Sequence, residues 1–358
     1  MAGLTQFQPN DIVNDVSNVV TSTWTNNTNN LTVAFTSSTQ AVFSSGTSSG
    51  AHYIDVYNAE PDSGAPHSYD ATAEVQYSIA YGHKAGSGSL DFTNDTGAVG
   101  NSPSRNIYSQ YRQLVFGDEA SSFTFDGFTP DDIYVININR ARYKHNLKPG
   151  TLDLRMFIAA SSSNTPAGLP SALLHLTDDS VTTTGSSTVT NTGRQFNIVS
   201  GSLGTMLGSN LTQVTDSGSY GLFYPDSGFI ILNPAAIDHQ IPNVAPGTSQ
   251  NTADNNPQKL LNAISHSGNF IIDSEEKVSS QFYFARARNY EYNYTTNPSF
   301  VDTNGNVNIN SMIDNPTVYI TTVGLYNTSG DLVAVAKLSQ PVTKDFTKEA
   351  LIRVKLDY

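Results

Sequence analysis

The clearest pattern of hydrophobic and polar positions lies in the last third of the chain. Residues 317–326 are rich in β-branched and aromatic side chains, which suit a pleated, half-buried strand. Turn-forming residues occupy 327–331, and the alternation of side chains resumes over 332–338. Two such runs around a turn that contains glycine predict a β-hairpin.

The last eight residues alternate in the same way. Leu351, Arg353, Lys355 and Asp357 fall on one face of an extended segment, and the opposite face is wholly apolar or aromatic: Ile352, Val354, Leu356 and Tyr358. A half-buried strand requires such a face. We therefore expect 351–358 to be a paired strand and not a free tail.

The rest of the chain continues the β pattern with few helical interruptions. Further strands are predicted at 31–35, 52–58, 73–81, 123–128, 133–138, 152–158, 173–176, 196–199 and 229–232, and again beyond 270. One helix is predicted at 106–116, where Ile107, Tyr111, Leu114 and Val115 recur at helical spacing and Ser104 is a candidate cap. A shorter helix is predicted at 257–264.

These elements predict a mainly β protein of several modules. We expect antiparallel sandwich- or barrel-like sheets, one or two short helices and an extended N-terminal arm. The expected divisions are an arm at 1–50, a central β-rich domain at 51–240 and a C-terminal β module at 257–358, with a linker rich in Pro, Asn and Thr before the last. The arm carries too many apolar anchors for a purely solvating tail: Val13, Val16, Val19, Val20, Trp24 and Phe43.

Composition and charge favour an assembly role. Only 14% of the residues are charged, against about a quarter in a typical protein. Charged residues are depleted at interface cores, so we favour surfaces that are buried against neighbours over a free β protein with a neutral polar surface. The net charge of −13 argues against nucleic-acid binding. Arg140, Arg142 and Lys144 would share a face of a strand, and we interpret this weak stripe as solvated or salt-bridged.

Cysteine is absent, which excludes disulfides and thiolate metal sites. The first residues lack the basic and apolar regions of a secretory signal, and no apolar run has the length of a membrane span. We expect no membrane partner and a protein that stays in the cytoplasm where it is made or joins something assembled there.

Candidate catalytic and metal-binding patterns are weak. Residues 46–50 match G-x-S-x-G without a strand before or a helix after them, so we attribute the match to composition. The seven histidines are scattered: His52, His67, His83, His145, His175, His239 and His266. The acidic doublets would place adjacent carboxylates on opposite faces of a strand: Asp118-Glu119, Asp131-Asp132, Asp178-Asp179 and Glu275-Glu276.

Two further patterns depart from known binding loops. Asp302, Asn304 and Asn306 resemble the start of a calcium loop, but Val307 and Ile313 stand where the EF-hand needs glycine and an acid. The segment 86–88 lacks the third glycine of a dinucleotide-binding loop. We therefore predict no catalytic, cofactor-binding or metal-binding residues, no cofactor and no enzymatic activity.

Aromatic residues cluster between positions 282 and 294. The cluster comprises Phe282, Tyr283, Phe284, Tyr290, Tyr292 and Tyr294. Such residues can bind sugars or pack at subunit interfaces. We favour core and interface roles over a sugar-binding platform.

Several strings carry a family resemblance. VYITTVGLYN with LVAVAKLSQPVTKDFTKEALIRVKLDY is similar to the C-terminal end of structural proteins from contractile-tailed bacteriophages, notably those of marine cyanobacteria. IAYGHKAGSGS, IYSQYRQLVF and DDIYVININRARYKHNLKPG add to the resemblance. Together these strings cover 78 of the 358 residues, and they contain no catalytic motif.

The resemblance implies a place in a virion and not an activity. We expect a non-enzymatic structural component of the tail or baseplate that contacts other virion proteins and copies of itself. The alternative is a tail protein that recognises the host by binding surface glycans. A head or neck protein and a polysaccharide-degrading enzyme are less favoured alternatives.

Overall fold

The structure is a computed structural model that divides into two compact units. It describes residues 5–28, 30–31, 35–36, 53–59, 72–88, 103–157, 173–183, 187–207, 218–237, 256–267, 269–295 and 297–357. Unit 1 consists of Met1–Asn18 and Lys277–Tyr358, and unit 2 of Val19–Glu276. The linker expected at 240–256 lies almost wholly outside the described residues, and its flanks, Ile237 and Asn256, both belong to unit 2.

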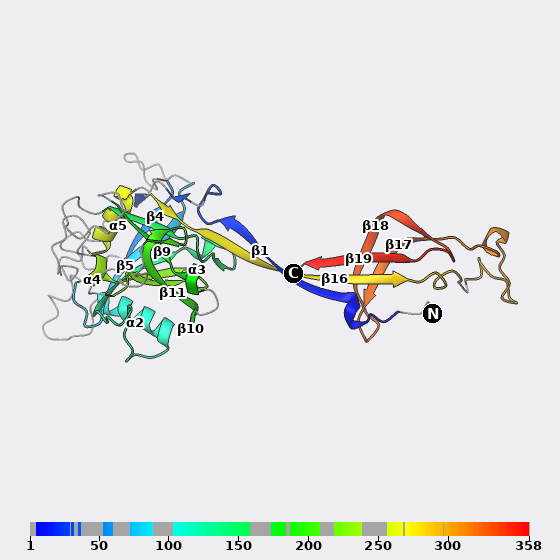
Figure 1. Cartoon of the computed structure of the whole chain (residues 1–358), viewed down its shortest axis with the longest axis horizontal. Helices are drawn as coiled ribbons and strands as arrows, with labels where there is room; N and C mark the ends of the chain where they lie inside the picture. The colour runs from blue at the N-terminus through cyan, green and yellow to red at the C-terminus, as the bar shows by residue number, and fades with distance from the viewer. Residues whose placement is uncertain are drawn as a thin grey trace. The chain divides into compact units, whose positions relative to one another are not determined.

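Unit 2 is built on one large antiparallel sheet, which forms a half-barrel (Figure 1). The main path of the sheet runs, in spatial order, β2 (Asn30–Leu31), β15 (Phe270–Ile271), β8 (Asp153–Phe157), β9 (Leu173–Asp178), β11 (Gly193–Ser202), β13 (Gly221–Tyr224), β14 (Phe229–Leu232), β6 (Asp132–Ile138), β5 (Val75–His83), β4 (Tyr53–Tyr57) and β3 (Phe35–Thr36). Two short strands, β10 (Thr188–Thr190) and β12 (Thr205–Met206), pair with β11. The sequence-based expectation of a mainly β protein with antiparallel sheets is confirmed.

The central strands of this sheet are buried on both faces. In β6, Ile133 and Val135 join one core cluster, whereas Tyr134, Ile136 and Ile138 join the other. Strand β14 divides between the same two clusters. Strands buried on both faces have nearly continuous apolar sequences, which explains the runs at 133–138 and 229–232.

Two helices cover the two faces. Helix α2 (Pro103–Phe116) contributes Tyr108 and Val115 to one cluster, and α5 (Asn256–Ser267) contributes Leu260 and Ile264 to the other. Both helices were predicted from their spacing. Two one-turn helices, α3 (Ser180–Thr183) and α4 (Pro234–Ile237), complete the α-helices of the described residues.

The predicted details of α2 need correction. Ser104 lies inside the helix and donates a hydrogen bond to the carbonyl oxygen of Ser87 at 2.8 Å, so it is not the cap. Leu114 is exposed, and the buried face is centred on Tyr108 and Val115. Tyr111 and Val115 therefore lie on the packed face as predicted, whereas Leu114 does not.

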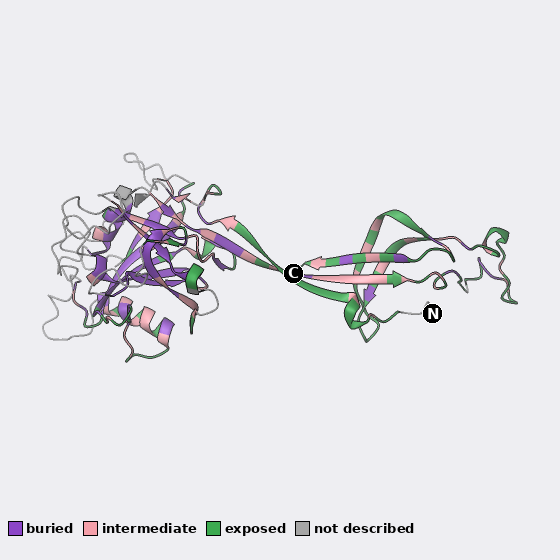
Figure 2. Cartoon of the chain, viewed as in Figure 1, coloured by how far each residue is buried: buried purple, intermediate pink, exposed green. Residues whose placement is uncertain are grey.

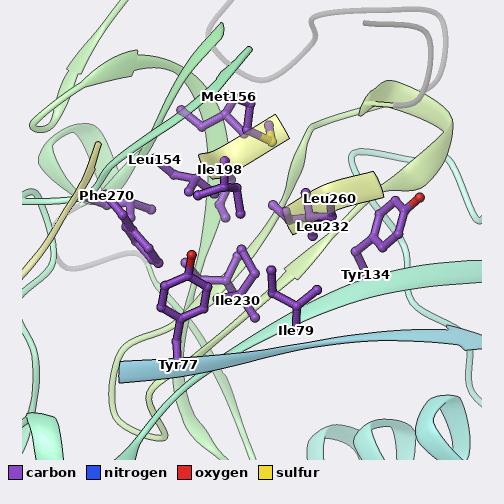
Figure 3. Close-up of a cluster of buried hydrophobic side chains, with 14 of the residues drawn as sticks. Tyr77, Ile79, Tyr134, Leu154, Met156, Ile198, Ile230, Leu232, Leu260 and Phe270 are labelled. Atoms are coloured by element: carbon purple, nitrogen blue, oxygen red, sulfur yellow. The ribbon is translucent and has the colours of Figure 1, made fainter. Parts of the chain in front are cut away.

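The larger core is anchored by aromatic rings from distant segments (Figure 3). The Trp24 ring lies 5.0 Å from the Phe270 ring, and its indole nitrogen donates to the Phe270 carbonyl oxygen at 2.9 Å. Tyr77 packs edge-on against Phe270 at 5.3 Å. Trp24 therefore acts as the apolar anchor that the sequence predicted, and it fixes the N-terminal segment to the core of unit 2.

Unit 1 consists of narrow sheets. Strands β1 (Ile12–Ser22), β16 (Asp273–Ala287) and β19 (Ala350–Asp357) form one sheet in that order. Strand β7 (Asn146–Leu147) pairs with the start of β16 within unit 2. Strands β17 (Val318–Tyr326) and β18 (Leu332–Lys344) form a separate two-stranded sheet.

The 3₁₀ turns of the described chain are η1 (Pro9–Asp11), η3 (Arg140–Arg142) and η4 (Asn310–Met312).

The two sharpest predictions for this region are confirmed. The β17–β18 hairpin forms around the turn at 327–331, and β19 pairs antiparallel with β16 from Ala350 to Asp357. Along β19 the exposed side chains alternate with buried or half-buried ones, and Val354 is the most buried of the apolar face. The C-terminal segment is thus an ordered strand up to Asp357, and Tyr358 lies outside the described residues.

One predicted strand is a tight turn, and the basic residues after β6 do not lie on a strand. Phe125 and Phe128 form a single bridge around a tight turn, not a strand, because Asp126 and Gly127 adopt positive φ values of 47° and 85°. Arg140 and Arg142 lie in η3, so they form no stripe on a strand with Lys144. Arg140 stacks on the Tyr143 ring, and Arg142 pairs with Glu74 at 2.6 Å, which confirms the salt-bridged interpretation for Arg142.

Candidate functional site

Unit 1 exposes most of its apolar residues. Among the described residues it contributes 16 of the 24 exposed large hydrophobic side chains, although it contains 100 of the 358 residues. It contributes only five of the 49 buried hydrophobic residues, and none to either core cluster. Figure 2 shows the contrast between the buried sheet of unit 2 and the exposed strands β17 and β18. Unit 1 therefore lacks a core of ordinary size.

The β17–β18 hairpin has an apolar outer face. Residues opposite each other in an antiparallel pair lie on the same face, and Tyr326 pairs with Leu332 while Gly324 pairs with Val335. A side chain on Gly324 would meet the Tyr326 ring at 3.0 Å and Leu332 at 3.3 Å, so both residues lie over Gly324. We define the outer face by four exposed residues: Tyr326, Leu332, Val333 and Val335.

The opposite face of the hairpin is better covered. Leu325 is buried, and Val323, Ala334 and Ala336 are half-buried. The outer face thus keeps large apolar side chains open to solvent near the turn, and Thr322 and Lys337, which pair with each other, lie beyond them on the same face.

The charges of the chain are unevenly divided between the units. Unit 1 holds eight Lys and Arg residues against nine Asp and Glu residues, a net charge of −1. Unit 2 holds ten against 22, a net charge of −12. The acidity of the chain thus belongs to unit 2, and unit 1 is nearly neutral.

A loop at 288–295, here called the tyrosine loop, presents three exposed aromatic rings. Tyr290 is 61% exposed, Tyr292 46% and Tyr294 55%. The Arg288 guanidinium donates to the Tyr290 hydroxyl at 2.8 Å, and the Tyr292 hydroxyl lies 2.6 Å from that of Thr5. The rings are therefore held in place although they face solvent.

A buried lysine organises this loop. Lys344, at the end of β18, donates to the side-chain oxygen of Asn293 at 2.6 Å and to the main-chain oxygen of Asn289 at 3.1 Å. Asn289 in turn donates to the main-chain oxygen of Phe346 at 2.9 Å. Burial lowers the pKa of the Lys344 ammonium, and the carboxylates of Glu291 and Asp345 act in the opposite direction.

The tyrosine loop borders a cavity of about 300 Å³ that opens to solvent. Its lining contains no charged side chain and comprises Tyr290, Tyr292, Asn293, Tyr294, Phe300, Val307, Met312, Ile313, Pro316 and Phe346. Apolar walls with a few polar groups are typical of sites that take neutral ligands or apolar side chains.

The aromatic cluster predicted from the sequence divides into two parts. Phe282, Tyr283 and Phe284 lie half-buried on β16, where the Arg353 guanidinium lies 5.4 Å from the Phe282 ring. The tyrosines of the loop, in contrast, are exposed, so they are not core residues of the single chain.

The predicted N-terminal anchors also divide. Trp24 is 2% exposed, whereas Val13, Val16, Val19 and Val20 all remain exposed along β1. The first nine residues of β1 are all exposed, so these valines lie on an extended strand with little cover from the chain itself, as expected for the arm. Phe43 lies outside the described residues.

The histidines that the structure describes have ordinary partners. The Nδ1 atom of His83 accepts hydrogen bonds from the main-chain nitrogens of Ala85 and Ser87, which shapes the turn after β5. Burial lowers the pKa of His83, against the opposing charges of Asp132 and Asp131. The side chains of His52, His67, His239 and His266 lie outside the described residues, and His145 is exposed.

His175 lies close to a carboxylate that sequence reasoning did not pair with it. Its Nδ1 atom is 3.2 Å from one carboxylate oxygen of Asp153, and the other carboxylate oxygen accepts hydrogen bonds from Arg155 and from the Ser202 hydroxyl at 2.9 Å. In a catalytic triad the serine hydroxyl binds the histidine. Here serine, arginine and histidine all converge on the carboxylate, so the cluster neutralises a buried charge.

The acidic doublets serve separate partners. The Asp178 carboxylate accepts hydrogen bonds from the Gly150 N–H and the Ser180 hydroxyl. The Asp179 carboxylate accepts hydrogen bonds from the main-chain nitrogen and the side-chain amide of Asn197. Burial raises the pKa of Asp178 to about 6. Asp118 binds the backbone of Ala120 and Ser121 in its own turn. These carboxylates shape turns and do not face each other across a cleft.

The two remaining motif candidates form local turns or lie outside the description. Asp302 accepts hydrogen bonds from the backbone of Asn304 and Asn306, which closes a turn on itself. The G-x-S-x-G match at 46–50 lies outside the described residues. Within the described ranges, no group of three or more His, Asp and Glu residues is arranged to hold a metal ion.

Comparison with known proteins gives no relative. The chain matches no family model, no curated protein and no solved structure. None of the helices in the described part of the chain has the length and apolar character of a membrane span.

Proposed function

We propose that this chain is a non-enzymatic structural component of a contractile-tailed phage virion, in its tail or baseplate, that acts through protein–protein contacts. The observation that carries the proposal is the exposed apolar surface of unit 1. Its exposed large hydrophobic residues outnumber its buried hydrophobic residues by 16 to five among the described residues. A module of this kind gains stability when a neighbour covers it.

The virion assignment rests on the resemblance of the strings at 79–89, 107–116, 131–150 and 318–358 to phage structural proteins. The low charge content of the chain agrees with it, because contact surfaces are depleted in charge. Unit 2 supplies a rigid, two-sided core, and unit 1 supplies the surface for contact.

Mass spectrometry of purified virions tests this proposal. Peptides from both units are expected in complete particles at many copies per particle, and antibodies against the chain are expected to label the tail or baseplate in electron micrographs. Complete, infectious particles that lack the chain would refute the proposal.

A second candidate, host recognition, is favoured by one observation. The tyrosine loop holds three exposed rings beside an uncharged cavity, and aromatic faces stack on sugar rings in glycan-binding sites. Binding of the purified chain to host cells, and its loss in a Tyr290→Ala/Tyr294→Ala double variant, would support this candidate. Equal binding by the double variant would contradict it.

A further inference from the structure

The outer face of the β17–β18 hairpin has the composition of a protein interface. Its members are tyrosine, leucine and valine side chains, and Val333 is 66% exposed. Strand β17 contains no charged residue, and β18 contains only Lys337 and the buried Lys344. Lys337 pairs with Thr322 and lies two residues from Val335, so it is the exposed charge on this face that a partner would have to leave in solvent.

The hairpin also lacks neighbours in its own sheet. In the described chain, β17 and β18 hydrogen-bond only to each other, so the outer edge of each strand is open. A two-stranded hairpin alone is marginally stable in water. Open edges are sites where another chain can add a strand.

The charge distribution indicates what covers the hairpin. Unit 2 has a net charge of −12, so two copies that met through unit 2 would bring like charges together. Unit 1 has a net charge of only −1. A basic partner would be attracted to unit 2, because charges steer association. An apolar face in a nearly neutral unit suits an identical face, since symmetric homo-oligomers use the same patch on both copies.

We infer that the outer face of the β17–β18 hairpin packs against the same face of a second copy of this chain. This inference rests on the proposed function, since it names one partner for the surface that assembly uses. The valines exposed on β1 belong to a second apolar strip that the inference does not require.

The first test is the mass of the purified full-length chain in solution. Sedimentation velocity or native mass spectrometry at micromolar concentration is expected to give a dimer or a higher homo-oligomer. Val333→Asp is expected to weaken self-association at least tenfold. Val189→Asp is the matched control, because Val189 is 76% exposed on β10 of unit 2 and is expected to leave the oligomer unchanged.

A second variant keeps the test decisive if Val333→Asp fails to fold. The chain has no cysteine, so Val333→Cys and Val189→Cys each introduce a single thiol. Maleimide is expected to modify Cys at position 333 at least tenfold more slowly than at 189, and dilution to monomer is expected to remove the difference. Trp24, the only tryptophan, reports through its fluorescence that the buried core of unit 2 stays folded.

A monomeric wild-type chain at tens of micromolar, or equal thiol reactivity at the two positions, would overturn the inference. A monomer that is nevertheless present in particles would overturn only the self-association and keep the proposed function. If the chain forms an oligomer that protects position 333 but is absent from particles, the inference stands and the proposed function is refuted.

Discussion

The ammonium of Lys344 donates a hydrogen bond to the side-chain oxygen of Asn293 at 2.6 Å. Lys344 is fully buried at the end of β18, and Asn293 lies in the tyrosine loop. A buried charge is tolerated when it is hydrogen-bonded. This contact therefore couples the shape of the tyrosine loop to the end of the hairpin.

Lys344→Met is expected to loosen the tyrosine loop. The substitution leaves the oxygens of Asn293 and Asn289 without their donor, which costs about 1–3 kcal/mol. Hydrogen exchange at residues 288–295 is expected to accelerate. Lys337→Met is the matched control, because Lys337 is exposed on the same strand, and unchanged exchange in both variants would contradict the role of Lys344.

Asp178→Asn is expected to change how the stability of unit 2 depends on pH. Burial raises the pKa of Asp178 from 3.8 to about 6. The folded protein therefore binds the Asp178 proton more tightly than the unfolded chain does. This proton binding stabilises the folded state fully below pH 3.8, and the stabilisation is lost as pH rises through 6. A shift of this size corresponds to about 3 kcal/mol.

The asparagine variant removes this titration and keeps an oxygen for the Gly150 N–H. Its unfolding free energy relative to wild type is expected to increase between pH 4 and pH 7 by up to about 3 kcal/mol. Urea unfolding followed by Trp24 fluorescence measures the difference. A difference that stays constant over this pH range would show that Asp178 keeps an ordinary pKa.

Tyr77→Phe is expected to stabilise unit 2 by about 1 kcal/mol. The Tyr77 hydroxyl is buried and has no hydrogen-bond partner among the described residues, and the ring contact with Phe270 survives the change. Tyr81→Phe provides the contrast, because the Tyr81 hydroxyl donates to Asp132 at 3.0 Å. A higher melting temperature for Tyr81→Phe than for Tyr77→Phe would contradict this account.

Deletion of residues 351–358 is expected to disrupt unit 1 and to leave the core of unit 2 folded. The deletion removes nearly all of β19, including its pairing with β16 and the buried side chain of Val354. We expect an insoluble or assembly-defective chain whose soluble fraction retains the native Trp24 emission. A truncated chain that stays soluble, melts at the wild-type temperature and assembles would show that the strand contributes little.

Local pattern was sufficient to predict much of this fold. The hairpin at 317–338, the strand at 351–358 and the helix at 106–116 follow from side-chain periodicity and turn residues. The turn at Asp126-Gly127 also carried a turn signal, and it was missed because the flanking phenylalanines favour strands. These features depend on neighbouring residues in the sequence.

Long-range pairing explains most of the differences. The position of β16 between β1 and β19 joins segments from opposite ends of the chain, and no local pattern encodes that order. The burial of Lys344 follows from the loop that folds over it, whereas an isolated lysine in a strand is typical of a solvated face. The exposure of the loop tyrosines likewise depends on how little of unit 1 is covered.

The most direct test of the account compares hydrogen exchange in purified particles with exchange in the dilute, isolated chain. The account predicts that amides of β17 and β18 exchange far more slowly in particles, whereas β6 and β14, buried on both faces in unit 2, exchange equally slowly in both states. Equal exchange of β17 and β18 in the two states would contradict the claim that unit 1 is covered by protein in an assembly.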